Sequence, residues 1–238
     1  MSQRLKFLVA YDGSEYAGWQ SQTHRNTIQD ELERAFHRIA GGHVRVHGAG
    51  RTDTGVHALA QCAHVDLPSR KLAAAAWLGS LNGVLPPAIR VLGCRYVTQN
   101  FHARFSAKGK TYRYRIWAGP ILPPLEIKRA WHISGSFDRD LFVAAGKRFV
   151  GEHNFAAFAA NRGKSEENRT RTIWSVTVRG RGPTITVEVS SATAAASLSL
   201  SSRDAHHSPL APGPGMRGLQ GRLWAKTRRF CSAQEERL

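Results

Sequence analysis

Segment 48–58 concentrates the residues of this chain whose types and spacing could do chemistry. It contains Gly-Ala-Gly-Arg-Thr-Asp-Thr-Gly-Val-His-Ala, with three glycines inside eight residues. Glycine permits positive φ and a close approach to the backbone, so we predict a shaped loop. Arg51 lies two residues before Asp53, and a nearby positive charge favours the ionised carboxylate that a nucleophile requires. A surface turn with a solvated ion pair would have the same spacing, so the loop alone identifies no reaction.

The loop also resembles part of a known family. Residues 51–58 resemble the signature of the tRNA pseudouridine synthase A family, whose members isomerise uridines in the anticodon arm of tRNA. Further segments resemble other motifs of that family, in the same order: 11–20, 101–107, 110–114, 151–155 and 169–173. Together these segments make the resemblance specific from the first strand to about residue 189.

The resemblance implies a role for three side chains. Asp53 would be the nucleophile, attacking either the ribose or the base, and Tyr112 would lie against the everted base. Arg51 would fill the space that the base leaves or hold the local phosphate. The expected reaction is redox-neutral, so no cofactor and no metal is expected. The resemblance further implies a homodimer that acts on the 3′ side of the anticodon arm of tRNA.

The charge of the chain favours an anionic partner. It carries 34 Lys+Arg against 17 Asp+Glu, a formal net charge of +17. Cations placed on phosphates release counterions and add affinity that does not depend on sequence, whereas no basic amphipathic helix suggests a membrane surface. Five cations in the central region are candidate phosphate contacts, although each could equally be a solvated charge: Arg104, Lys108, Lys110, Arg113 and Arg115.

Cysteine usage and the N-terminus bear on location. The three cysteines, Cys62, Cys94 and Cys231, are widely spaced and fit neither a zinc site nor a CxxC redox motif. The apolar run of residues 1–10 is interrupted by two cations and is too short for a signal peptide or a membrane span. We therefore expect a soluble, cytoplasmic protein with reduced thiols.

Periodicity predicts an α+β fold. In the first half we expect strands at 5–11, 44–49, 56–67 and 89–97, with helices at 26–40 and 69–82. This order is that of a ferredoxin-like unit, with helices on one face of an antiparallel sheet and the other face open. Trp19, in the loop after the first strand, is expected in the core rather than in a groove.

The second half repeats this pattern incompletely. We expect strands at 111–117, 172–178 and 184–189 and a helix over 136–150. The domain prediction is an N-terminal half with the catalytic loop (1–105), a truncated second half (106–189) and a basic tail (190–238). By resemblance, the two ferredoxin-like halves would form a pseudouridine synthase fold.

The composition changes from residue 190 onward. Residues 190–202 are almost all Ser, Ala, Thr and Leu, and several prolines and glycines follow before a basic stretch. This composition predicts a disordered tail. The family pattern, including a Met-Val-Arg helix whose arginine would adjoin Asp53, is absent here. One hypothesis is a frameshift in the coding sequence, which would leave the chain poorly stable and weakly active; translation of the other reading frames would test it.

Two other functions remain open at this stage. A non-catalytic RNA-binding remnant of the family would keep the basic groove without the chemistry. A glycoside hydrolase would use carboxylates at a sugar carbon, but no second carboxylate accompanies Asp53 in its loop.

Overall fold

The computed structural model divides the chain into two compact units. The structure describes all residues except 1, 24–25, 69–71, 157–168, 193–230 and 238. Of the described residues, the first unit contains those within 2–111 and 232–237, and the second contains those within 112–192 together with 231. The predicted low-complexity and basic tail therefore lies largely outside the described residues.

The first unit has the element order βαββαβ. Its elements are β1 (Gln3–Tyr11), α1 (Ile28–Ala40), β2 (Val46–Gly48), β3 (Ala58–Leu67), α2 (Ala74–Val84) and β4 (Ile89–Val97). The strands lie in the order β4-β1-β3 with β2 beside β3, and these pairs are antiparallel. This is the arrangement of a ferredoxin-like unit, so the α+β prediction is confirmed here.

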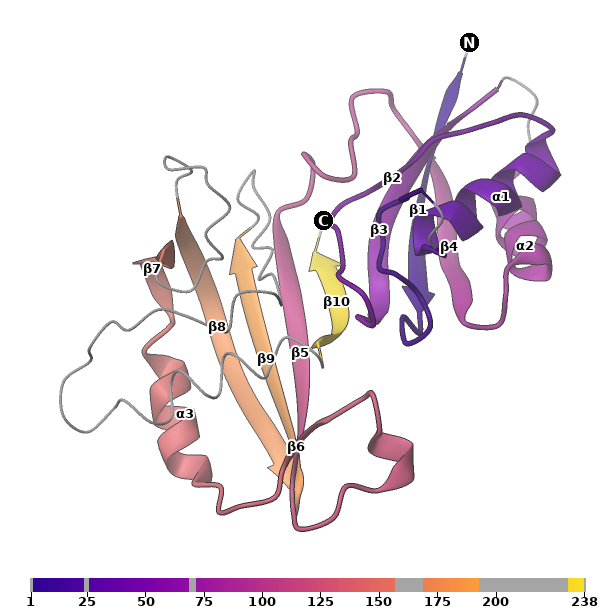
Figure 1. Ribbon diagram of the computed structural model, residues 1–238. Coiled ribbons are helices and arrows are strands. Elements are labelled where there is room, and N and C mark those ends of the chain that lie inside the picture. Colours follow the sequence, from indigo (N-terminus) through magenta and orange to yellow (C-terminus); the bar gives the residue numbers. More distant parts are fainter. Residues whose placement is uncertain (1, 24–25, 69–71, 157–168, 193–230, 238) are drawn as a thin grey trace. The chain divides into compact units, whose positions relative to one another are not determined.

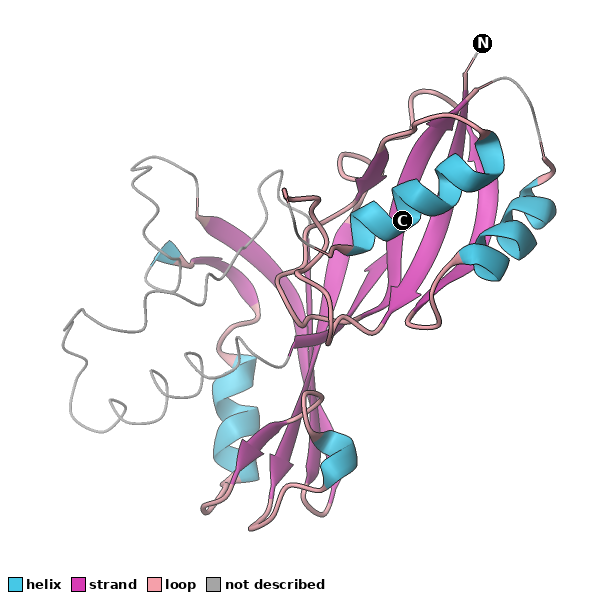
Figure 2. Cartoon of the chain, turned by 45° about the vertical axis from the view of Figure 1, so that its right-hand side comes forward, coloured by secondary structure: helices cyan, strands magenta, loops and turns pink. Residues whose placement is uncertain are grey.

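Both helices cover one face of this sheet (Figures 1 and 2). Alternate residues of β1 point to that face, and Leu5, Phe7 and Val9 are completely or almost completely buried. Phe36 of α1 packs between Phe7 and Trp77 of α2, with ring centroids 5.4 Å apart in each pair. This aromatic row fixes the helices on the sheet, because aromatic side chains bury large areas.

Helix α1 ends at Ala40 as predicted and begins at Ile28, two residues inside the predicted range of 26–40. The Thr27 hydroxyl accepts a hydrogen bond from the Asp30 N–H, which caps the N-terminus. Gly41, at φ 74°, ends the helix in the left-handed conformation that glycine adopts without strain. The apolar residues Ile28, Leu32 and Phe36 recur at helical spacing and are all fully buried.

The segment after β4 covers part of the other face of the sheet. Arg4 of β1 donates to the carbonyl oxygens of Gln99 and Phe101, each at 2.7 Å, and pairs with Asp66 of β3. Ala103 and Ala107 then pack against Cys62 and Ala49 in a small second cluster. The face that we predicted to be open is thus partly covered, because Arg4 ties this segment across the strands.

The second unit contains a second sheet. It comprises β5 (Gly109–Ala118, starting in the first unit), a 3-10 turn η1 (Pro124–Glu126), β6 (Trp131–Ile133), α3 (Arg139–Lys147), β7 (Gly151–Asn154), β8 (Thr170–Arg181) and β9 (Thr184–Ala192). The strand order is β5-β9-β8-β7, with β6 parallel to β5. Ile116, Trp131, Ile185 and Val187 form its core.

Several element predictions need correction. Strands β6 and β7 were not predicted, since three or four residues show no periodicity. Helix α3 begins after Asp138, which caps it, rather than at Ser136. Residues 231–237, expected in a disordered tail, form β10 (Cys231–Arg237), which pairs parallel with β3. A strand there occupies hydrogen-bonding groups that β3 would otherwise leave at a sheet edge.

Candidate functional site

A buried hydrogen-bond network holds the start of the loop that carries Asp53. The Tyr11 hydroxyl of β1 donates to Gln61 Oε1 at 2.8 Å and lies 2.9 Å from Thr52 Oγ1. Gln61 Nε2 in turn donates to the carbonyl oxygen of Gly50 at 2.9 Å. Buried polar groups that are fully paired fix a backbone, because breaking any of these bonds leaves an unsatisfied group. Thr52 is therefore tied to two strands of the sheet.

Glycines of the preceding loop bring its backbone against the Asp53 loop. A Cβ on Gly13 would lie 1.9 Å from the Val56 carbonyl oxygen, and one on Gly18 would lie 2.5 Å from the Thr52 carbonyl oxygen. Gly18 also has φ +94°, and the neighbouring Trp19 N–H donates to that Thr52 oxygen at 3.0 Å. The two segments that resemble family motifs therefore pack backbone to backbone, and only glycine fits at these contacts.

This packing presents Asp53 at the surface. Thr52 is buried, whereas Asp53 and Arg51 on either side of it are exposed. His57, in the same loop, lies 3.0 Å from Asp12 Oδ1 through Nδ1. The result is an exposed carboxylate on a backbone that the core holds rigidly.

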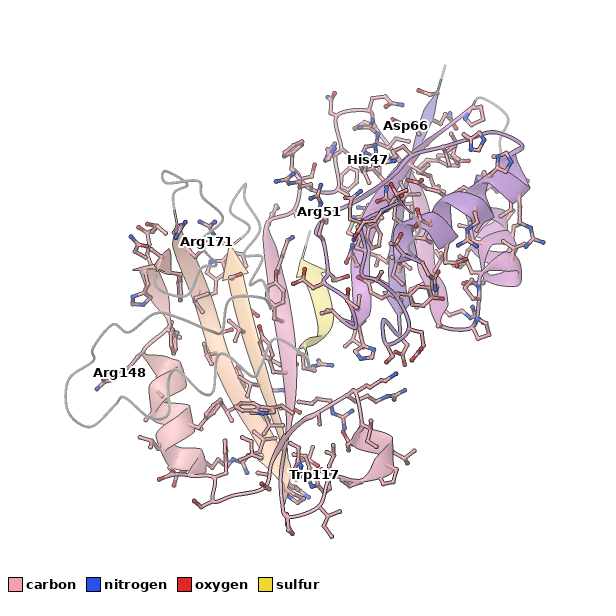
Figure 3. All side chains as sticks on the ribbon, in the orientation of Figure 1. His47, Arg51, Asp66, Trp117, Arg148 and Arg171 are labelled. Atoms are coloured by element: carbon pink, nitrogen blue, oxygen red, sulfur yellow. The ribbon has the colours of Figure 1, made fainter. Side chains whose placement is uncertain are left out.

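A basic pocket of about 390 Å³ lies beside this loop in the first unit. Four cations line it: Arg45, Arg51, Arg104 and Lys110. Four rings line it as well: Trp19, His47, His102 and Phe105. His47 and Arg51 come from β2 and the loop that follows it (Figure 3). Among the described residues that line the pocket, none is acidic, so its charge suits an anion.

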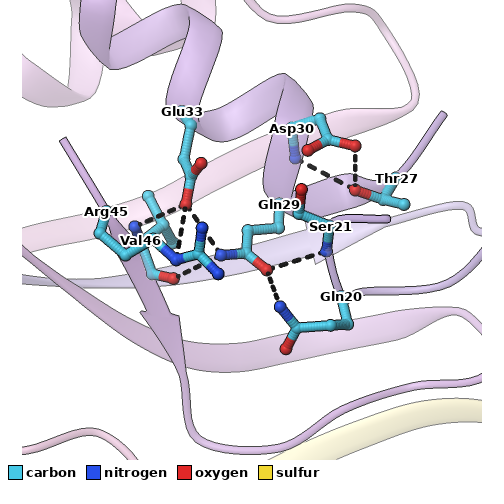
Figure 4. Close-up of polar contacts among 8 residues, drawn as sticks. All are labelled: Gln20, Ser21, Thr27, Gln29, Asp30, Glu33, Arg45 and Val46. Carbon is cyan, nitrogen blue, oxygen red and sulfur yellow. Dashed lines mark hydrogen bonds and ion pairs between the residues drawn. The ribbon is translucent and has the colours of Figure 1, made fainter. Parts of the chain in front are cut away.

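Helix α1 positions the β2 side of this pocket. Gln29 is buried, and its Nε2 donates hydrogen bonds to the Val46 carbonyl oxygen and to Glu33 Oε1. Its Oε1 accepts hydrogen bonds from the Gln20 side chain and the Ser21 N–H (Figure 4). Glu33 also accepts the Val46 N–H at 3.0 Å, and Arg45 lies 3.7 Å from the same oxygen. Two side chains of one helix therefore set the position of β2 and of the cation at its start.

Three histidines from separate elements lie close together, and two of them, His47 and His102, line the pocket. The His64 ring of β3 lies 4.9 Å from His47 and 4.6 Å from His102, centroid to centroid. His64 is 1% exposed, and its Nδ1 accepts the Ala103 N–H at 3.2 Å. Burial, together with the charges of His102 and Arg4, lowers the pKa of His64 to about 4. Burial likewise lowers the pKa of His102, so both rings are neutral at pH 7.

His64 is expected to destabilise the fold in acid. Its pKa is about 6.5 in the unfolded chain and about 4 in the folded one, so the unfolded state binds the proton first as pH falls. Stability should fall between pH 6.5 and 4 and be unaffected by this group above that window. His64→Gln should lessen the loss between pH 7 and pH 4.5 by about 2 kcal/mol, measured by urea unfolding.

A surface variant that changes no titratable group provides the control for this experiment. Replacing the exposed Leu92 with alanine should leave the stability difference between the two pH values unchanged. If His64→Gln and the parent lose the same stability between pH 7 and 4.5, the buried neutral imidazole does not contribute as described.

The structure brings some of the predicted residues together. Arg51, Arg104 and Lys110 line one pocket, and Lys110 Nζ donates to the Ala49 carbonyl oxygen at 3.0 Å. Lys108 is exposed in the segment before β5. Asp53 adjoins the pocket through Arg51 but does not line it.

The other predicted residues belong to the second unit. Arg113 pairs with Glu188 at 2.6 Å and Arg115 with Glu126 at 2.7 Å, so a phosphate would compete there with a carboxylate. Tyr112 is partly buried on β5. Whether Tyr112 meets the base beside Asp53 stays a prediction. Trp19, expected in the core, is 2% exposed and packs there, although its edge also reaches the pocket.

Four residues at or beside the pocket were not predicted from the sequence: Arg45, His47, His64 and the aromatic Phe105. A histidine inside the otherwise apolar run of β3 was the available signal for His64. Within the described residues, no group of His, Cys, Asp and Glu is arranged to hold a metal ion. No helix in the described part of the chain is both long and apolar enough to cross a bilayer.

Comparison with known proteins extends these observations. Residues 7–106 match a family model described as tRNA pseudouridine synthase. The chain is 50% identical over 161 residues to the tRNA pseudouridine synthase A of Akkermansia muciniphila, which covers 67% of this chain and 61% of that protein. It is 43% identical over 179 residues to the protein of the same name from Solidesulfovibrio magneticus, covering 73% of this chain and 65% of the other.

The chain thus spans less than two thirds of the length of these relatives. Among solved structures, a chain of the archaeal box H/ACA sRNP Nop10-Cbf5 complex is 14% identical, with a TM-score of 0.36. That match covers 79% of this chain and 38% of the other. A structural similarity with so low a TM-score carries no argument about the fold of this chain.

Proposed function

By sequence the chain belongs to the tRNA pseudouridine synthase A family, and from this premise we propose that it isomerises uridine to pseudouridine in the anticodon arm of tRNA. One observation carries the proposal: an exposed carboxylate, Asp53, stands on a backbone fixed by buried hydrogen bonds and close glycine contacts, beside a pocket lined by cations. A reaction at the sugar of an RNA needs both an anionic group aimed at it and cations for the phosphates.

The reaction exchanges one bond at C1′ of the ribose for another. The N1–C1′ bond breaks, the uracil turns, and C5 bonds to C1′. C5 then loses its proton and N1 gains one, so the atoms balance and no oxidant or reductant takes part.

Asp53 acts as the nucleophile in this scheme. If it attacks C1′, its oxygen bonds to that carbon as the uracil leaves, and C5 later displaces the carboxylate. If it attacks the base, the carboxylate adds to the ring and is released after the new bond forms. In the attack on C1′, the negative charge of the carboxylate also stabilises the positive character that develops at that carbon, as in glycosidases.

Two further residues assist the everted nucleotide. A uridine in a stacked arm must be turned out, which costs a few kcal/mol and must be offset by contacts to the nucleotide and its phosphates. Arg51, at the edge of the basic pocket, holds the adjacent phosphate or fills the vacated space. Tyr112 supplies a ring face for the base, and its hydroxyl assists removal of the C5 proton.

The family resemblance completes this proposal. It assigns tRNA as the partner, a homodimer as the working form, the cytoplasm as the location and no cofactor. The net charge of +17 supports an RNA partner, since each cation placed on a phosphate contributes to binding.

A tritium-release assay tests the function. Transcribed tRNA labelled with tritium at C5 of uridine releases the label only if C5 loses its hydrogen. With enzyme in excess, we expect release from an anticodon-arm position and pseudouridine at the same position by mass spectrometry. Salt-sensitive binding without any release would instead favour the non-catalytic RNA-binding remnant.

The same assay should include a chimeric protein whose C-terminal segment comes from a relative in the family. In it, residues after 189 are replaced by the corresponding segment of the Akkermansia muciniphila relative. We expect faster release from this version, because the family pattern places an arginine beside the nucleophile. Release by neither protein would contradict the proposed function.

A further inference from the structure

The basic pocket has a feature that the proposed isomerisation does not use. Its rings and cations alternate, yet Asp53, the nucleophile, is not among its lining residues. Arg51 does line it and stands two residues from Asp53, which limits their Cα atoms to about 7 Å. A nucleotide in this pocket would therefore be next to the reacting one rather than the reacting one itself.

Phe105 presents an exposed ring to the pocket. The residue is 72% exposed, so its ring is accessible to a ligand. The His102 ring lies 4.5 Å from it, and the Arg104 guanidinium lies 5.7 Å from its centroid. The two ring planes are tilted by 35°. Exposed rings with an adjacent arginine are a usual platform for an unpaired base in single-stranded RNA.

The platform is held in place rather than loose. Arg4 binds the backbone at residues 99 and 101, and His64 accepts the Ala103 N–H. The His102 N–H donates to Ser106 Oγ, and the Ser106 N–H donates back to the His102 carbonyl oxygen. A preorganised ring binds a base without the entropy loss of ordering a mobile segment.

The volume and chemistry of the pocket fit one nucleotide. About 390 Å³ lies in the range of small-molecule sites, roughly 300–1,000 Å³. The His47 and His102 rings offer flat faces, and Arg51 and Lys110 also line the pocket, so these cations can bind the phosphate that joins that nucleotide to its neighbour.

We propose that this pocket is a subsite for the nucleotide that flanks the target uridine, with its base stacked on Phe105 and His102 and its phosphate between Arg51 and Lys110. The subsite rests on the proposed function for its RNA partner. It adds a second unstacked nucleotide to the one that reacts, so the enzyme recognises a loop in which two neighbouring bases can leave the stack.

A coupling experiment tests the subsite by binding alone. All proteins carry Asp53→Ala to prevent turnover, and the probe is a fluorescent anticodon stem–loop RNA followed by anisotropy. Phe105→Ala should weaken binding by roughly 5- to 100-fold, the effect of one base–ring stack. Phe105→Tyr should bind like the parent, since it keeps the ring. Leu92→Ala, which removes an exposed apolar side chain outside the pocket, should also bind like the parent.

RNA with an abasic residue beside the target identifies the base concerned. On one side of the target uridine, the abasic residue should weaken RNA binding by the parent. With that RNA, Phe105→Ala should cause no additional loss of affinity, because the base that stacks on the ring is already missing. Three outcomes would overturn the subsite. In the first, the abasic change at either flank and Phe105→Ala weaken binding independently of each other. In the second, Phe105→Ala binds the RNA like the parent, and in the third the parent does not bind the RNA at all. Turnover is measured separately with Asp53 intact. If no isomerisation occurs but the flanking base and Phe105 still depend on each other in binding, the proposed function is rejected and the subsite is kept.

Discussion

Asp53→Asn is expected to reduce tritium release by about a thousandfold or more while the fold and the RNA affinity remain. The amide has nearly the same shape but no negative charge to form a bond or to stabilise the sugar carbon. Because Asp53 is exposed and the buried Thr52 provides the contacts to the core, the unfolding transition should not change. Removal of a negative charge near phosphates should, if anything, tighten binding.

The matched control for this change is Glu15→Gln. Glu15 is exposed in the loop between β1 and α1, so the substitution removes the same charge without touching the proposed nucleophile. It should release tritium at the parental rate. Equal losses in the two variants would mean that net charge, and not a carboxylate at position 53, supports the reaction.

Gly13→Ala is expected to impair both the stability and the activity of the protein. The added methyl group would lie 1.9 Å from the Val56 carbonyl oxygen and 2.7 Å from its carbon, and neither backbone atom can move as a side chain would. Relief of this contact must push the two loops apart, and a displacement of about 1 Å at a catalytic group can cost a hundredfold in rate. Chemical denaturation and tritium release measure the two effects.

Gly79→Ala separates this clash from the general effect of replacing glycine. Gly79 lies inside α2 with open space around its Cβ position, so alanine there should stabilise the protein by about 0.5–1 kcal/mol. Parental stability and activity in Gly13→Ala would contradict the close packing of the two loops.

The sequence predicted well those elements whose signals are local. Helix α1 has a threonine cap, a glycine stop and an apolar face at the right spacing, and the structure has all three. Helix α2 was expected from Ser69 but begins at Ala74, since a run of alanines contains no apolar period that marks a start. The short strands β6 and β7 depend on pairing with longer strands and were therefore invisible.

The residues of the candidate site also differ in whether local sequence signals could predict them. Asp53 and Arg51 lie two residues apart in one loop, so the sequence alone suggested them as candidates, together with the glycines of that loop. The pocket that forms the subsite combines Trp19, His47 and Phe105 from three distant segments, and the strand pairing and the contacts of Arg4 help to bring them together. Such a site depends on tertiary contacts that no local pattern encodes.

The charged strand residues show a second limit of sequence reasoning. Arg113 and Arg115 were predicted as candidate phosphate contacts because they belong to a basic central region. Their carboxylate partners, Glu188 and Glu126, lie 75 and 11 residues away. The local sequence could not identify these groups opposite the strand.

Incubation with RNA that carries 5-fluorouridine at the target position tests the central claim most directly. Fluorine at C5 blocks the final proton loss, so an attacking carboxylate should leave a covalent adduct or a rearranged fluorinated product. We predict one of these with Asp53 present and neither with Asp53→Asn. The same product from both proteins would contradict the account, because a group other than the carboxylate at position 53 would then perform the chemistry.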